Sequence, residues 1–85
     1  MEVQLDIYIE PNCATCDTAN KIARSVKQKM PAVQVSVIDL TRSDADPPLS
    51  VFAVPTYVIN GQTVSLGNPR ENELLSHLDL ALQGI

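Results

Sequence analysis

The two cysteines of this sequence form a single closely spaced pair, Cys13-Ala14-Thr15-Cys16. An alternating apolar segment precedes the pair and a segment of helical periodicity follows it, which places Cys13 where a strand meets a helix. The positive end of a helix and its unpaired N–H groups lower the pKa of a thiol at that point. Cys16 lies on the same side of the first turn, within disulfide distance of Cys13. The spacing therefore predicts thiol–disulfide exchange in which Cys13 attacks a substrate disulfide and Cys16 resolves the mixed disulfide.

The elements that position this pair follow from hydrophobic periodicity. Residues 3–9 alternate apolar and polar side chains, which predicts a strand with one buried face. Apolar residues then recur at helical spacing from the cysteines to Met30, and Pro31 ends this helix because its ring forbids continuation. Valines alternate again within residues 32–40, which predicts a second strand. Two strands joined by a helix in this way are expected to be parallel.

The second half of the chain predicts a hairpin and a final helix. Residues 56–60 and 62–66 read as two strands joined by a tight turn at Asn60-Gly61. Gly67 ends the hairpin, and Asn68 is expected to cap the last helix, with Pro69 at its first position and Glu71 completing a capping box.

The segment between these halves is expected to carry a reduced helix. Pro47-Pro48 interrupts residues 41–53, so that one or two helical turns, or none, can form. We expect its apolar residues Leu49 and Phe52 to shield Tyr8 and Ile38 on one sheet face. The rest of that face is polar and is expected to be open to water.

Together these elements give the order β-α-β-(short α)-β-β-α. The fold class is α/β: a four-stranded mixed sheet with two helices on one face and a reduced second helix. A chain of 85 residues is too short for two hydrophobic cores, so residues 1–85 are expected to form one domain.

Composition limits the partners. The net charge is −4, and the sequence has no basic stripe to neutralise phosphates, so we expect neither nucleic acid nor a membrane as a partner. No apolar run approaches the ~20 residues of a membrane span. The first residues lack a secretory signal. We therefore expect a cytoplasmic monomer, a setting in which a close cysteine pair is typically catalytic or metal-binding.

Several segments resemble the thioredoxin/glutaredoxin superfamily over nearly the whole chain. The matching segments are Ile7-Tyr8, the cysteine motif, Val54-Pro55-Thr56, Val58-Ile59-Asn60-Gly61 and Gly67 before the last helix. The resemblance implies a thioredoxin-like fold and a small thiol–disulfide oxidoreductase that acts on protein disulfides in electron transport and cell redox homeostasis. It implies a redox-active Cys13–Cys16 disulfide with no bound cofactor. It also implies a cis Val54-Pro55 bond facing the cysteines, with Val54, Pro55 and Thr56 binding a substrate strand.

The sequence departs from the family pattern near the motif. Ala14-Thr15 stands where thioredoxins have Gly-Pro and many glutaredoxins have Pro-Tyr, and Asn12 replaces the thioredoxin Trp. Half of the glutaredoxin Gly-Gly segment is missing, which leaves Gly67 and Arg70 as the candidate glutathione contacts. The expected recycling partner is accordingly either a reductase or glutathione.

Asp6 lies near the place of the buried acid that thioredoxins keep beneath their cysteines. It is a candidate proton acceptor for the resolving thiol. The alternative is a solvent-facing strand carboxylate, because Gln4, Asp6 and Tyr8 share the face opposite the apolar one.

Two other functions fit the same motif. A metal-binding C-x-x-C module is one, although those modules carry a Met where this chain has Pro11 and end in a strand rather than a helix. The other is a thioredoxin-fold interaction domain without redox turnover. Disulfide reduction would separate the oxidoreductase from both, and metal retained by the reduced protein would favour the module.

Overall fold

The computed structural model describes residues 2–45, 47, 51 and 53–84. The elements follow the expected order: β1 (Val3–Ile9), α1 (Ala14–Lys29), β2 (Val33–Asp39), β3 (Thr56–Ile59), β4 (Gln62–Leu66) and α2 (Glu71–Leu82). The four strands form one sheet in the order β2-β1-β3-β4. β1 is parallel to β2 and antiparallel to β3, and β4 is antiparallel to β3. The expected mixed four-stranded sheet is confirmed.

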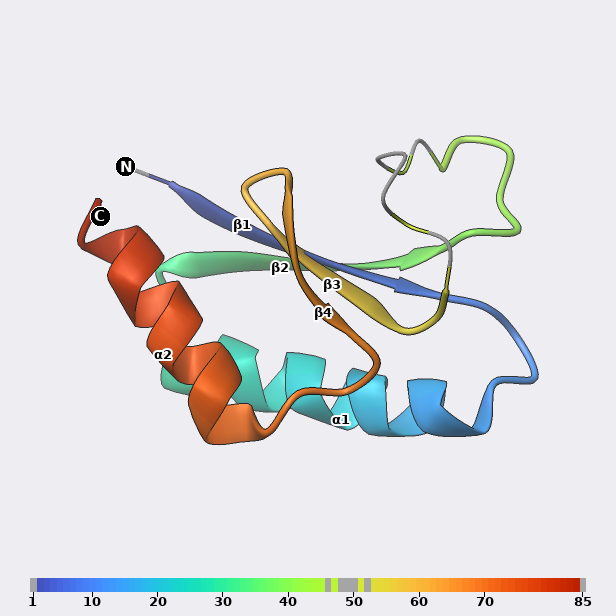
Figure 1. Ribbon diagram of the computed structural model, residues 1–85, viewed down its shortest axis with the longest axis horizontal. Coiled ribbons are helices and arrows are strands. Elements are labelled where there is room, and N and C mark those ends of the chain that lie inside the picture. The colour runs from blue at the N-terminus through green and yellow to red at the C-terminus, as the bar shows by residue number, and fades with distance from the viewer. Residues whose placement is uncertain (1, 46, 48–50, 52, 85) are drawn as a thin grey trace.

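Both helices lie on the same side of the sheet, below it in the view of Figure 1. The described residues that follow β2 rise on the opposite side, at the right-hand end of the view. One buried layer joins the sheet to the helices. Its members come from β1, β2, β3 and both helices: Val3, Leu5, Ile7, Ala19, Ala23, Val26, Val33, Tyr57, Ile59, Leu74 and Leu78. Burial of this apolar surface is the main contribution to the stability of so small a domain.

The hairpin turn has the conformation that its sequence predicts. Asn60 has a φ of 50° and Gly61 a φ of 83°. Two successive residues at positive φ are typical of the tight turn that matches the twist of antiparallel strands. Asn60 also anchors the turn to β1, because its side-chain Oδ1 accepts a hydrogen bond of 2.9 Å from the Gln4 amide.

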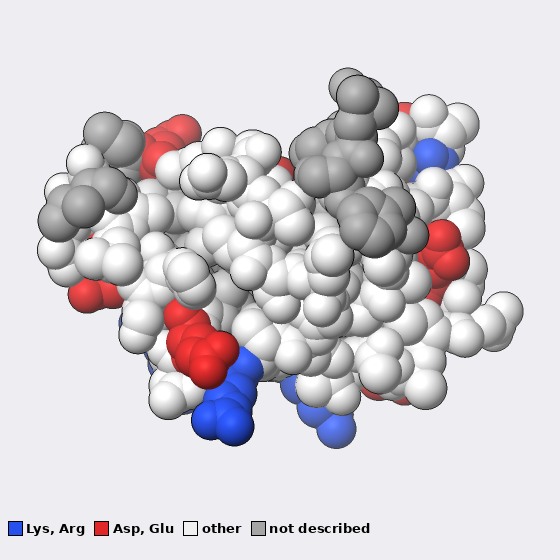
Figure 2. Space-filling model, viewed as in Figure 1, with Lys and Arg blue, Asp and Glu red and all other residues white. Residues whose placement is uncertain are grey.

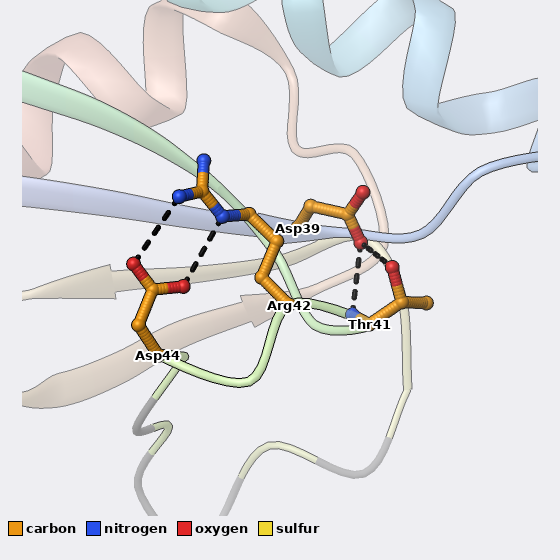
Figure 3. A network of polar contacts seen from close by, with 4 residues as sticks. All are labelled: Asp39, Thr41, Arg42 and Asp44. Atoms are coloured by element: carbon orange, nitrogen blue, oxygen red, sulfur yellow. Dashed lines mark hydrogen bonds and ion pairs between the residues drawn. The ribbon is translucent and has the colours of Figure 1, made fainter.

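The described residues directly after β2 form turns. Asp39 Oδ1 accepts hydrogen bonds from the Thr41 amide (2.8 Å) and the Thr41 hydroxyl (2.7 Å), and these two bonds lower the pKa of the Asp39 carboxyl (Figure 3). Arg42 then forms a bidentate ion pair with Asp44, at 3.1 and 3.2 Å. None of the described residues between Asp39 and Thr56 is helical. This agrees with a reduced second helix, whereas Leu49 and Phe52 lie outside the described residues.

The same segment lines a depression over the face of the sheet that the helices leave uncovered. Tyr8, Ile38, Arg42, Asp44 and Ala45 line it, and Tyr8 is nearly inaccessible to solvent. Further along that face, Gln4 Nε2 donates to Ser36 Oγ at 3.0 Å, so the side chains of the face are polar there and bond to one another. The described residues thus show the polar part of this face, whereas shielding of Tyr8 and Ile38 by Leu49 and Phe52 stays a prediction.

Hydrogen exchange measures how firmly this segment is held. We expect the amides of Ser43 and Asp44 to exchange much faster than those of residues 22–26 in α1. The helix amides open only with much of the domain, at about 5 kcal/mol or more, whereas loop amides open at nearly no cost. Exchange at Ser43 and Asp44 as slow as in α1 would contradict the expected weak protection of this connection.

Candidate active site

The cysteine motif lies where β1 passes into α1. β1 ends at Ile9, and Asn12 takes a φ of 60°, a left-handed conformation that Asn tolerates better than most residues. Cys13 is the N-cap residue of α1 with an extended backbone, and the Cys16 amide donates a 3.1 Å hydrogen bond to its carbonyl. Cys13 thus precedes the first helical turn, as the sequence predicts, and its sulfur lies at the positive end of α1.

Cys13 and Cys16 form a disulfide, with their Cα atoms 5.2 Å apart. Their environments differ. Cys13 is half-buried, whereas Cys16 is only 3% exposed. Cys16 belongs to the buried side of α1 together with Ala19, Ala23 and Val26, because residues 16, 19, 23 and 26 recur at helical spacing. A substrate can therefore reach the sulfur of Cys13 more easily than that of Cys16.

A second segment, Val54-Pro55-Thr56, enters β3 at the same end of the sheet (Figure 1). The Val54-Pro55 peptide bond is cis, as the resemblance implies. Pro55 and Thr56 are buried and Val54 is half-buried. The Thr56 hydroxyl donates to the Ala53 carbonyl at 2.6 Å, and Thr56 pairs with Tyr8 of β1. Within the described part of the chain, no backbone hydrogen bond joins Val54 to another residue.

The connection from β4 to α2 joins these two segments, and we call Gly67-Asn68 the clasp. The Gly67 amide donates to the Pro55 carbonyl at 2.7 Å. The Asn68 side-chain amide Nδ2 donates to the Thr15 carbonyl, between the two cysteines, at 2.8 Å. Its Oδ1 accepts a 2.8 Å hydrogen bond from the hydroxyl of Tyr57, whose pKa is raised by burial. One short segment therefore holds both the cysteine turn and the proline loop.

The clasp corrects the expected capping of the last helix. α2 begins at Glu71 with Arg70 as its N-cap residue, and no side chain caps it. Asn68 lies too early to cap the helix, and its amide is occupied by Thr15 and Tyr57. Sequence reasoning missed this role because the same short amide that suits an N-cap also suits a tertiary contact. Its position directly after Gly67 and before Pro69 was the available signal of a constrained connection.

Asp6 lies on the sheet face away from the helices. Val3, Leu5 and Ile7 pack against α1 and α2, so the alternation of a strand turns Asp6 to the other side. There its Oδ1 accepts a 2.9 Å hydrogen bond from Gln4 Nε2. This placement matches the strand-carboxylate alternative, and a role in proton transfer stays a prediction.

The two candidate glutathione contacts are placed differently. The Gly67 amide already donates to the Pro55 carbonyl, so its N–H is not free for a ligand. Arg70 is exposed immediately before α2. Glutathione binding through either residue stays a prediction.

Negative charge surrounds the motif in the sequence. Glu10 precedes it and Asp17 follows it, and no Lys or Arg lies within four residues. Four of the six Lys and Arg residues lie further along α1, at positions 21, 24, 27 and 29. Figure 2 shows blue side chains mostly at the lower edge of this view, while red ones are scattered over it. Among the residues adjacent to the motif in sequence, none carries a positive charge that would favour a thiolate at Cys13, whereas the helix terminus does favour it.

The described residues offer neither a membrane span nor a metal cluster. Among them, no helix is long and apolar enough to cross a membrane. In the same residues, no group of three or more His, Cys, Asp or Glu side chains lies close enough together to hold a metal ion.

Comparisons with known proteins agree with this geometry. A family model described as the thioredoxin domain matches residues 1–79. A thioredoxin of Methanocaldococcus jannaschii is 30% identical over 76 residues, covering 87% of this chain and 89% of that protein. Among solved structures, oxidised thioredoxin O2 of Arabidopsis thaliana superposes with a TM-score of 0.70 at 19% identity, over 92% of this chain and 73% of that one. A structure titled as a malarial protein gives a TM-score of 0.74 at 15% identity, over 93% and 96% of the two chains.

The two solved structures share the fold at low sequence identity, and the family match adds the sequence relationship over nearly the whole chain. The adjacent cysteine pair supports a redox role. The chain belongs to the thioredoxin family.

Proposed function

We propose that this protein is a thiol–disulfide oxidoreductase that reduces or exchanges disulfides in protein substrates through Cys13 and Cys16. The observation that carries the proposal is the difference in exposure and position between the two cysteines of the disulfide. Cys13 is accessible at the positive end of α1, and Cys16 is buried one turn deeper. Such an arrangement gives one thiol the properties of a nucleophile and the other those of a resolving group.

The reaction balances in two exchanges. In the first, the Cys13 thiolate attacks one sulfur of the substrate disulfide; the substrate S–S bond breaks, a mixed disulfide forms, and one substrate thiolate leaves. In the second, the Cys16 thiolate attacks Cys13 Sγ, which forms the Cys13–Cys16 disulfide and releases the second substrate thiolate. The two released thiolates take up two protons. Two electrons pass from the protein to the substrate, and the product is the disulfide present in this structure.

The surface beside Cys13 suits an extended protein segment. The Val54 backbone has no hydrogen-bond partner among the described residues, so it can pair with a substrate strand. Leu66, which pairs with Thr56 across the hairpin, is 51% exposed and offers an apolar contact nearby. Val54, Pro55 and Thr56 are therefore the proposed substrate-binding segment. Protein disulfides fit this surface better than a small molecule, which would leave Leu66 exposed.

The oxidised protein needs an electron donor for the next cycle. We propose recycling by a reductase or by glutathione in the cytoplasm, with the protein acting as a monomer. Reduction of the oxidised protein by glutathione, compared with reduction by a thioredoxin-reductase-type enzyme, identifies the donor. An Arg70→Ala variant adds a test of the glutathione contact, because loss of that contact slows reduction by glutathione and leaves the enzyme-driven reaction unchanged.

Two other functions remain distinguishable by experiment. A metal-binding module would retain stoichiometric metal after purification in the reduced state, and an interaction domain would show no disulfide reduction. Insulin reduction with dithiothreitol as the donor separates the proposed function from both.

Alkylation kinetics test the assignment of the nucleophile. In the reduced protein near pH 7, we expect iodoacetamide to modify Cys13 at least about tenfold faster than Cys16, because only Cys13 combines exposure with the helix terminus. Mass spectrometry of peptides quenched over time measures both rates in one sample. Equal rates at the two thiols would contradict the assignment.

Matched serine variants test the division of labour between the thiols. Cys13→Ser is expected to abolish insulin reduction, since it removes the attacking sulfur. Cys16→Ser is expected to keep the first attack and accumulate a mixed disulfide, because no resolving thiol remains. Non-reducing electrophoresis detects that adduct. Insulin reduction at the rate of the parent protein in Cys13→Ser would rule out Cys13 as the nucleophile.

A further inference from the structure

Thr15, between the two cysteines, lies in contact with the proposed nucleophile. Its Oγ1 is 3.4 Å from Cys13 Sγ. In the disulfide the sulfur carries no hydrogen, so the Thr15 hydroxyl is the donor. When the reduced sulfur ionises to attack a substrate it becomes a charged acceptor, and a hydrogen bond to an ionised acceptor is stronger than one to a neutral acceptor. The contact therefore favours the charged form of Cys13.

The backbone of Thr15 is held by the clasp. Asn68 Nδ2 donates to the Thr15 carbonyl at 2.8 Å. Tyr57 fixes which end of the Asn68 amide faces Thr15. Its hydroxyl donates to Asn68 Oδ1 at 2.8 Å, and because an amide oxygen can only accept, Nδ2 is left to face the Thr15 carbonyl. Tyr57 is fully buried, and burial raises the pKa of its hydroxyl. The un-ionised phenol is also the ordinary state of tyrosine near neutral pH, so the hydroxyl has a proton to donate. The chain of contacts thus runs from the core to the reacting sulfur.

Charged neighbours give Cys13 little help. Glu10 and Asp17, on either side of the motif, oppose a negative sulfur. The residues of the proline loop, Val54-Pro55-Thr56, and of the clasp are uncharged. Arg70, two residues beyond Asn68, is exposed at the start of α2. Among the described residues, the Thr15 hydroxyl is thus a neutral donor in contact with Cys13 that adds to the effect of the helix terminus.

We infer that the Thr15 hydroxyl stabilises the Cys13 thiolate by hydrogen bonding, and that Asn68 is a positioning residue that acts through Thr15. This inference rests on the proposed function only in that Cys13 is taken as the attacking thiol.

Thiolate titration of the reduced protein tests the role of Thr15. The variants are built on Cys16→Ser, so that the ultraviolet absorbance of the thiolate reports Cys13 alone. Thr15→Val keeps the shape of the side chain and removes the donor, and we expect the midpoint to rise by about one pH unit. Thr15→Ser restores the hydroxyl and is expected to titrate like the parent. Thr18→Val, an exposed threonine on the same helix, is the matched control and is expected to leave the midpoint unchanged.

A double-mutant cycle tests the role of Asn68. Asn68→Ala is expected to shift the midpoint in the same direction as Thr15→Val but by less, and to add nothing when it is combined with Thr15→Val. A purely structural role would lower the melting temperature and leave the midpoint in place. Coincident titration of Thr15→Val and its parent would overturn the inference. Since titration requires no substrate, the two tests are independent: a shifted midpoint in the Cys16→Ser series, together with no insulin reduction by the protein that keeps both cysteines, would support this inference and count against the proposed function.

Discussion

The packing of α1 against the sheet is the constraint on which the site depends. Val3, Leu5 and Ile7 on β1 meet Ala19, Ala23 and Val26 on α1, and the small alanine side chains allow the helix to approach closely. This contact fixes both the position of the helix and its rotation about its axis. Cys16 continues the buried face of the helix toward its N-terminus. Cys13 precedes the first turn and therefore does not belong to that buried face. The unequal exposure of the two sulfurs is thus a consequence of helical periodicity, set by residues that take no part in the chemistry.

Strand pairing and the clasp together place the proline loop near the cysteines: Thr56 pairs with Tyr8 at the end of β1 that leads to the motif. The loop enters β3, whereas the motif opens α1, and the two are joined through the clasp that follows β4. Two hydrogen bonds, from the Gly67 amide and from the Asn68 side chain, tie residues distant in sequence into one surface. Because Tyr57 orients the clasp from within the core, the geometry of the site is connected to the same apolar layer that holds α1. A polar contact of this kind depends on a buried hydroxyl having a partner, which Asn68 provides.

The sequence predicts the parts of this molecule that periodicity controls. The alternation in β1, the stripe in α1 and the Asn60-Gly61 turn each have one strong local cause, and each appears where expected. The motif at the strand–helix junction follows from the same local rules. The flanking Gly67 and Pro69 indicate only a constrained connection at Asn68. Its partner could not be predicted, because the Thr15 carbonyl lies 53 residues away and no local periodicity relates the two positions. The alternation of β1 predicts the sheet face on which Asp6 lies. Its hydrogen bond with Gln4 is known only from the structure.

The balance of charge around the cysteines bears on the kind of redox protein this chain forms. A strongly stabilised thiolate is a good leaving group and makes the disulfide oxidising, as in proteins whose reduced form is greatly favoured. Here Glu10 and Asp17 oppose the charge, and the four basic residues of α1 lie beyond the first turn. A neutral hydroxyl, that of Thr15, lies 3.4 Å from Cys13 Sγ. The helix terminus and one hydroxyl lower the free energy of the thiolate only moderately. Under the proposed function, we therefore expect the Cys13 thiolate to be nucleophilic near neutral pH and Cys13 to be a poorer leaving group, so that the protein donates electrons to substrate disulfides more readily than it withdraws them from substrate thiols.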